Sequence, residues 1–220
     1  MNPRKLFFLV FIFTGSITAM AEVGVTVGAR AGFNIAHMRK FTPPDLYNKR
    51  VIMGADLAAV LRIDFTKNFG FQTEVEFTQK GQGWKRTQDS AHYSGKLIAN
   101  YVQFPLLAVG RVGSEKYKAV FLLGPYFAYW TGGYTQQSVS VDHYTLNAQT
   151  VKYEYTKNDN RFDVGWVTAA GADFKVGKGW IELMARHNLG FLSMAKKNSG
   201  LPNTYTCNFS LSLGYRYTIK

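Results

Sequence analysis

The chain has 220 residues, with 26 lysines and arginines, 14 acidic residues and a formal net charge of +12. Its length is that of one domain, and its single cysteine excludes a disulfide within the chain. No uninterrupted apolar stretch reaches the roughly 20 residues that a transmembrane helix requires, so a helical membrane span is excluded as well.

The first 21 residues have the pattern of a secretory signal peptide. Arg4 and Lys5 give a basic start, residues 6–13 form an apolar run, and residues 19–21 have the small-x-small pattern after which signal peptidase cleaves. We therefore predict that residues 1–21 are a signal peptide, which is removed on export.

The predicted mature domain, residues 22–220, remains basic. Removing 21 of the 220 residues takes away only two charged groups, Arg4 and Lys5, which lowers the net charge from +12 to about +10. Because export separates the chain from nucleic acid, we expect no nucleic-acid partner and expect lipid phosphates to be the anionic neighbours. Cys207 lies far from the cleavage site, so we expect no lipid anchor.

Eight segments of the mature domain have the composition of β-strands. In most of them apolar and polar residues alternate, which gives a strand one apolar and one polar face. In the segment 50–64 every odd position is apolar, whereas Arg50, Asp56 and Arg62 occupy even positions. We predict strands near residues 23–34, 50–64, 69–80, 96–109, 117–130, 161–174, 180–190 and 203–220.

The fourth and fifth of these strands lack a clear alternation. Residues 106–109 and 119–123 are apolar on both faces, so the sequence leaves the register of both strands open. Pro105 and Pro125 each lack a backbone donor for the β-ladder. We therefore predict a bulge or a strand end at each proline.

The connections between the strands alternate in length, as they do in outer-membrane barrels, where short turns and both termini are periplasmic and long loops lie outside. The last strand also has tyrosines near both ends of its apolar face, which suits two membrane interfaces. We predict an all-β fold, an eight-stranded antiparallel up-and-down transmembrane β-barrel in the outer membrane of a Gram-negative bacterium. Long connections lie near 36–49, 81–95, 131–160 and 191–202, and short ones near 67, 111–116 and 175–178.

The polar faces of the predicted strands carry charges of both signs. A soluble barrel would alternate as well, with its apolar face inward, but mixed charges and glycines on one face favour the narrow lumen of a membrane barrel. The charges either pair into a plug, which we favour and in which we expect Arg186 to pair with Glu182, or line a conduction path. The predicted lumen network consists of Arg30, Asp56, Glu74, Glu76, Glu182, Arg186 and Arg216.

Five motifs resemble, in chain order, the PorT-like outer-membrane β-barrel family of Bacteroidetes. They are Gly28–Asn34, Phe71–Gly81, Tyr101–Pro105, Gly124–Tyr126 and Arg186–Gly190. The chain departs from the family at Gln103, where glutamate is common, and at its end, Thr218-Ile219-Lys220, which is not aromatic. The resemblance implies an outer-membrane barrel whose namesake takes part in type IX secretion and gliding-associated export, and it supplies no catalytic residue.

Three basic pairs fall in predicted outer loops. They are placed to contact lipopolysaccharide phosphates, although plain solvation explains them equally well. The longest loop, 131–160, is rich in tyrosine and glutamine, and we predict that it extends the strands as a β-rich projection that contacts a partner. The basic pairs are Arg39 and Lys40, Lys85 and Arg86, and Lys196 and Lys197.

The four histidines do not have the spacing of metal ligands, and we expect no metal or cofactor. Ser90 and Ser94 flank His92, which raises the alternative of a lipid-A-modifying barrel enzyme, but neighbours in sequence seldom form a catalytic pair. The histidines are His37, His92, His143 and His187.

These features favour a non-enzymatic outer-membrane protein that acts at the cell surface or in envelope assembly through its outer loops. The family resemblance adds an association with protein secretion. The expected partners are outer-membrane lipid, lipopolysaccharide and envelope or secretion proteins. The alternatives are a narrow transport pore, which requires an open lumen, and a lipid-A-modifying enzyme, which requires a lateral opening between strands.

Overall fold

The computed structural model describes residues 23–43, 47–141, 144–197 and 199–219. The predicted signal peptide and His143 lie outside the described residues, so the cleavage site remains a prediction. Within the described ranges, no helix is long and apolar enough to cross a membrane.

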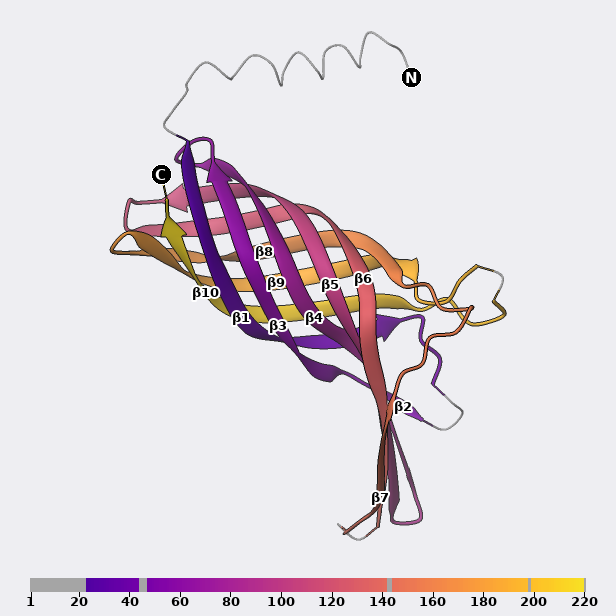
Figure 1. Cartoon of the computed structure of the whole chain (residues 1–220). Coiled ribbons are helices and arrows are strands. Elements are labelled where there is room, and N and C mark those ends of the chain that lie inside the picture. Colours follow the sequence, from indigo (N-terminus) through magenta and orange to yellow (C-terminus); the bar gives the residue numbers. More distant parts are fainter. Residues whose placement is uncertain (1–22, 44–46, 142–143, 198, 220) are drawn as a thin grey trace.

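Eight antiparallel strands close into a barrel (Figure 1). Each strand of the ring pairs with its neighbours in the chain, and the first and last strands pair from Thr26↔Thr218 to Arg39↔Tyr205. Closure leaves the ring without a free edge, which a sheet in lipid requires because no water there satisfies the backbone. The predicted fold is therefore confirmed. The strands of the ring are β1 (Gly24–Arg39), β3 (Ile52–Asp64), β4 (Phe69–Gln88), β5 (Ala91–Gly113), β6 (Tyr117–Val141), β8 (Phe162–Val176), β9 (Gly179–Ser193) and β10 (Tyr205–Thr218).

The apolar faces of the strands point outward and the polar faces point into the lumen. In β3, for example, Met53 and Leu57 are 69% and 48% exposed, whereas Asp56 and Arg62 are fully buried. A soluble barrel has the opposite arrangement, with its apolar face inside. The outer apolar surface therefore faces lipid, as the charges and glycines on the polar faces predicted.

One side of the lumen is apolar rather than polar. The inward residues of β5, β6 and β8 include Leu107, Val109, Val120, Leu122 and Val167, which pack with Met184 of β9 in one buried cluster. These strands meet lipid on one face and this apolar cluster on the other. This arrangement explains why the fourth and fifth predicted strands are apolar on both faces.

The two prolines lie inside continuous strands, so the predicted bulges or strand ends are wrong. Pro105 faces Tyr126 across β5 and β6, and Pro125 faces Trp166 across β6 and β8. The register is the same on both sides of each proline, and the one shift between β5 and β6 lies at Asn100/Tyr101. Each proline interrupts a ladder locally instead. Phe104 and Pro105 have no partner in β4, and Gly124 and Pro125 have none in β5.

Three strands continue past the barrel and form a projection (Figure 1). The extended parts of β4, β5 and β6 pair with one another, while the short strand β2 (Asn48–Arg50) pairs with β4 and β7 (Tyr144–Lys152) pairs with β6. The β-rich projection predicted within 131–160 is therefore present. The predicted loop at 81–95 is wrong, because β4 and β5 form a hairpin whose turn residues Asp89 and Ser90 have φ of 47° and 64°. Positive φ at both positions is typical of the two-residue turns that suit hairpin twist.

The projection lies at the end of the barrel opposite to the start of β1, the end of β10 and the short turns between strands (Figure 1). In outer-membrane barrels the termini and short turns are periplasmic. The projection therefore extends from the outer surface of the cell.

A charge on the lipid-facing surface is expected to destabilise the barrel. Leu213, near the middle of β10, is 60% exposed on that surface. Leu213→Arg should lower the free energy of unfolding by about 2–4 kcal/mol, the cost of arginine near the bilayer midplane. Urea unfolding in lipid vesicles measures this change. The control is Leu201→Arg, because Leu201 is a similarly exposed residue outside the strands; equal stability of the two variants would contradict the lipid-facing assignment.

Candidate functional site

The centre of the lumen holds a cluster of two arginines and three carboxylates. Arg30 of β1 contacts Asp56 at 2.5 Å, Glu74 at 2.8 Å and Glu76 at 3.0 Å. Arg186 of β9 reaches Glu74 from across the lumen at 2.7 Å. Glu74 is thus clamped between two guanidinium groups that belong to different parts of the ring. All five side chains are almost completely buried.

A second cluster lies nearer the periplasmic end. Arg62 of β3 contacts Asp173 at 2.9 Å and Glu182 at 2.7 Å, and Arg216 of β10 contacts the same two carboxylates at 2.5 and 3.3 Å. Gln72 connects this cluster to the first, because its carbonyl accepts from Arg62 at 2.6 Å and its amide donates to Glu74 at 2.6 Å. The two clusters therefore form one continuous network.

A third group of polar residues lies nearer the outer end of the lumen. Asp163 of β8 accepts hydrogen bonds from Tyr126 at 2.9 Å and Thr206 at 2.7 Å, and its carboxylate is 3.4 Å from the ammonium of Lys80. The Lys80 ammonium also lies 4.9 and 4.4 Å from the ring centroids of Tyr101 and Tyr126. Aromatic faces stabilise a buried ammonium in this way.

The expected pairing of Arg186 with Glu182 is wrong. The two residues lie four positions apart on β9, and four residues of a strand span about 13 Å. Each therefore pairs across the lumen with a different cluster, Arg186 with Glu74 and Glu182 with Arg62.

The structure places all seven predicted lumen residues inside the barrel and adds six charged residues, of which Arg62 and Asp173 pair with predicted residues and the other four pair with one another. The same inward alternation marks most of these partners, since Arg62 follows Asp56 by six residues in β3 and Lys80 follows Glu76 by four in β4. Tyr101 and Tyr126 gave no such signal, because their strands are apolar on both faces. The added charged residues are Arg62, Asp64, Lys80, Arg111, Asp163 and Asp173.

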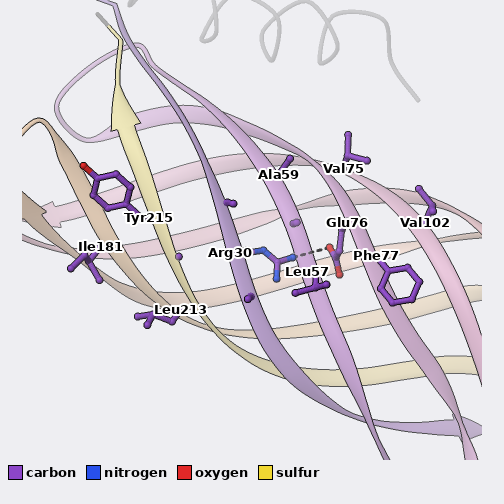
Figure 2. A pocket seen from close by; sticks show the side chains of 14 residues that line it. Arg30, Leu57, Ala59, Val75, Glu76, Phe77, Val102, Ile181, Leu213 and Tyr215 are labelled. Atoms are coloured by element: carbon purple, nitrogen blue, oxygen red, sulfur yellow. Dashed lines mark ion pairs between the residues drawn. The ribbon is translucent and has the colours of Figure 1, made fainter.

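The outer face of the barrel has a shallow apolar depression of about 790 Å³. Small residues, Ala29 and Ala31 of β1 and Ala59 of β3, line it together with larger neighbours such as Leu57 and Leu213. The lining also includes Arg30 and Glu76, which pair with each other inside the lumen (Figure 2). The depression lies within the apolar band that meets lipid.

The three predicted basic pairs have different surroundings. Arg39 donates a hydrogen bond to the Gly190 carbonyl, and Arg39 and Lys40 both lie 5.5 Å from the Tyr205 ring centroid. Lys196 and Lys197 are exposed in the connection between β9 and β10. Only this last pair has the free loop setting that the sequence predicted.

Lys85 and Arg86 lie in β4 rather than in a loop, and this changes how they can act. Adjacent residues of a strand point to opposite faces. Arg86 lies 5.9 Å from the ring centroid of Tyr47, whereas Lys85 lines a groove with residues of β5 and β6. The two side chains therefore cannot act as one basic pair.

The serine and histidine candidates do not contact one another among the described residues. Ser90 lies in the hairpin turn, His92 bonds through Nδ1 to Thr87 at 3.0 Å, and Ser94 bonds to the Ser138 hydroxyl at 2.7 Å. His187 approaches the Cys207 sulfur at 3.4 Å on the outer face. His37 faces Cys207 across the β1–β10 ladder.

An aromatic cluster lies at the outer mouth of the barrel. Trp130 packs against Tyr153 and Tyr155 with ring centroids 4.8 and 5.0 Å apart, beside a pocket of about 230 Å³ that is also lined by Asp159. The Tyr153 hydroxyl donates to the Asp159 carboxylate at 3.1 Å. Burial and the Asp159 charge raise the pKa of Tyr153 to about 12, because both disfavour the phenolate.

The sequence matches the family described as outer membrane protein beta-barrel domain over residues 19–196. The chain belongs to this family. Membership agrees with the closed ring of strands, and together they place the protein in the outer membrane. No curated protein sequence matches the chain.

Solved structures similar to this outer-membrane barrel include Ail, the attachment invasion locus protein of Yersinia pestis, in complex with the heparin analogue sucrose octasulfate. The two are 15% identical, the match covers 88% of this chain and 99% of Ail, and the TM-score is 0.39. The outer membrane protein OprG from Pseudomonas aeruginosa is 10% identical over 89% of this chain and 96% of its own, with a TM-score of 0.46. The outer membrane protease OmpT from Escherichia coli is 10% identical over 91% and 98%, with a TM-score of 0.44.

Removal of one central guanidinium tests the lumen network. Arg186→Ala leaves Arg30 as the one arginine that contacts Glu74 and Glu76. Breaking a buried ion pair in this way costs about 3–5 kcal/mol. The folded band in detergent should therefore melt at a lower temperature than that of the parent protein. Lys178→Ala, in the exposed turn before β9, is the control.

A double-mutant cycle identifies the partner of Arg186. Arg186→Ala should couple more strongly with Glu74→Gln than with Glu182→Gln, because Arg186 contacts Glu74 directly and is connected to Glu182 only through Glu74, Gln72 and Arg62. Unchanged melting of Arg186→Ala, or coupling to Glu182 instead, would contradict the arrangement.

The effect of the Asp159 charge on the pKa of Tyr153 should be measurable by titration. Because its raised pKa favours the neutral phenol, Tyr153 contributes stability that is fully present below pH about 10 and is lost as the pH rises through about 12. Asp159→Asn should shift one tyrosinate absorbance step to lower pH, and Tyr153→Phe should remove that step. Identical titration curves for the parent and Asp159→Asn would rule out the contact.

Proposed function

We propose that this barrel is a non-enzymatic component of the cell surface that acts through its projection. The supporting observation is the open edge of the projection: in the pairing of the described residues, β7 bonds to β6 and to no other strand. Tyr144 and Val151 of β7 are 77% and 51% exposed. An exposed strand edge can accept an extended segment of another protein by strand addition.

The filled lumen supports this proposal over a transport pore. The network contains six cationic and seven acidic side chains that engage one another rather than leaving a row of free charges along an axis. Apolar residues of β5, β6 and β8 fill the other side, and the aromatic cluster lies at the outer mouth. Eight strands enclose little more room than these side chains occupy.

The lack of contact between His92 and either neighbouring serine supports a non-enzymatic role. A serine nucleophile requires a base within hydrogen-bond reach, and His92 bonds to Thr87 instead. The lipid-A-modifying enzyme therefore ranks below the surface component.

Two kinds of partner belong to the proposal. The resemblance to PorT-like barrels suggests that the protein bound by the projection is a secretion or envelope-assembly component. Lipopolysaccharide phosphates are the proposed anionic contacts of the basic residues near the outer surface, which are Arg39, Lys40, Lys85, Arg86, Lys196 and Lys197.

Site-specific crosslinking in the native outer membrane tests the role of the projection. A photoreactive residue in place of Tyr144, an exposed residue of β7, should capture one or more discrete envelope proteins. The same group at Lys178, in an exposed turn at the periplasmic end, is the matched control. No capture at position 144, or the same capture pattern as at Lys178, would contradict the proposed interaction.

Bilayer conductance tests the filled lumen separately. The reconstituted parent protein should give no sustained ion conductance, because the paired charges and the apolar cluster occupy the lumen. A stable open channel in the parent protein would favour the transport pore instead.

A further inference from the structure

A groove of about 580 Å³ crosses the base of the projection. Three cationic residues from three strands line it, namely Arg50 of β2, Lys85 of β4 and Lys96 of β5. The strand register places them on one face of the sheet, since Gly83 pairs with Arg50 on one side and with Lys96 on the other, and Lys85 follows Gly83 by two residues. The groove is therefore a feature of the sheet and not of a loop.

Gly83 forms the floor between the cations. It has no side chain, and a Cβ added there would lie 3.2 Å from Arg50 Cβ and 3.3 Å from the Arg50 carbonyl oxygen. The backbones of Arg50 and Lys96 are two strand spacings apart, which is about 10 Å. Long basic side chains on either side of this gap can converge on one anion above the glycine.

The positive charge of the groove is not neutralised. Its lining contains no aspartate or glutamate, and among the described residues none of the three cations is in an ion pair. The neighbouring positions on the same face are hydroxyl and amide groups, including the bonded pair Ser94 and Ser138 and the side chain of Gln136. These groups can donate further hydrogen bonds to anionic oxygens.

The apolar end of the groove indicates where the anion comes from. Val51 and Met53 line the groove and are 59% and 69% exposed. Met53 belongs to the same outward row of β3 as Leu57, which faces lipid. The groove therefore begins where the lipid-facing surface ends, which is the level of the lipid headgroups.

We propose that Arg50, Lys85 and Lys96 bind a phosphate group of a phosphorylated glycolipid in the outer leaflet. The three cations contact the phosphate oxygens, and Val51 and Met53 pack against the apolar part of the same lipid. This inference rests on the proposed function, because both require the projection to lie at the outer surface of the cell. The proposed site adds Arg50 and Lys96, which were not among the predicted basic pairs, to Lys85. It does not include Arg86, which points to the opposite face of β4.

Lipid binding by the purified full chain in detergent tests the site. The probes are a bisphosphorylated lipid A and the same lipid after enzymatic removal of its phosphates. We expect the parent protein to prefer the phosphorylated lipid, and the triple variant Arg50→Gln, Lys85→Gln and Lys96→Gln to bind it about tenfold or more weakly. The control variant Lys67→Gln, Lys116→Gln and Lys178→Gln removes the same charge from exposed turns at the periplasmic end and should bind as the parent does.

Three outcomes would overturn the inference. These are equal binding of both lipids by the parent protein, equal weakening by the control variant, and a preference of the groove for a soluble sulfated polysaccharide over the lipid. Retention of the heat-shifted folded band shows that the triple variant is folded. If folding fails, Gly83→Glu, which places a carboxylate on the groove floor, should abolish the lipid preference.

The crosslinking experiment keeps this inference distinct from the proposed function. The triple variant should still crosslink through position 144, because Tyr144 of β7 does not line the groove. Loss of protein capture with intact lipid preference would overturn only the role of the projection, and the reverse result would overturn only the lipid site.

Discussion

The clamp of Glu74 between Arg30 and Arg186 is the contact on which the interior of the barrel depends. Lipid outside the barrel forces polar side chains inward, and eight strands leave too little room to hydrate them there. The charges must therefore satisfy one another. Gln72 extends the clamp to the cluster near the periplasmic end, so that strands far apart in the ring are joined through one network. As a consequence, the loss of a single partner leaves a buried charge without a counterion.

The two halves of the lumen are filled by different kinds of side chain. The polar network occupies the side formed mainly by β1, β3, β4, β9 and β10, while the apolar cluster occupies the side formed by β5, β6 and β8. Apolar packing needs no exact partner, whereas each guanidinium needs a carboxylate at the correct height. The polar side therefore fixes the relative heights of its strands, and the apolar side fills the remaining volume.

Alternation along the chain predicts the face of a residue but not its partner. It correctly predicted six of the eight strands and the inward position of Arg186, because both follow from a period of two, whereas the fourth and fifth strands were predicted without a clear alternation. It could not predict that Arg186 meets Glu74 and not Glu182, since the stagger of strands around the ring decides which residues share a height. It also failed at 81–95, where polar residues of an exposed hairpin look like those of a loop although they form ladders with both neighbours. The prediction at Pro105 was wrong because the β4–β5 ladder lacks two pairs there and then resumes in the same register.

The barrel and the projection share three strands, since β4, β5 and β6 run through both without a break. The external sheet is therefore a direct continuation of the barrel wall. The basic groove lies at the junction of the barrel and the projection, between the lipid-facing row of β3 and the first residues of the projection. A lipid phosphate bound there would brace the base of the sheet against the membrane surface. The open edge of β7 would then be presented away from the bilayer, where a strand from another protein can reach it.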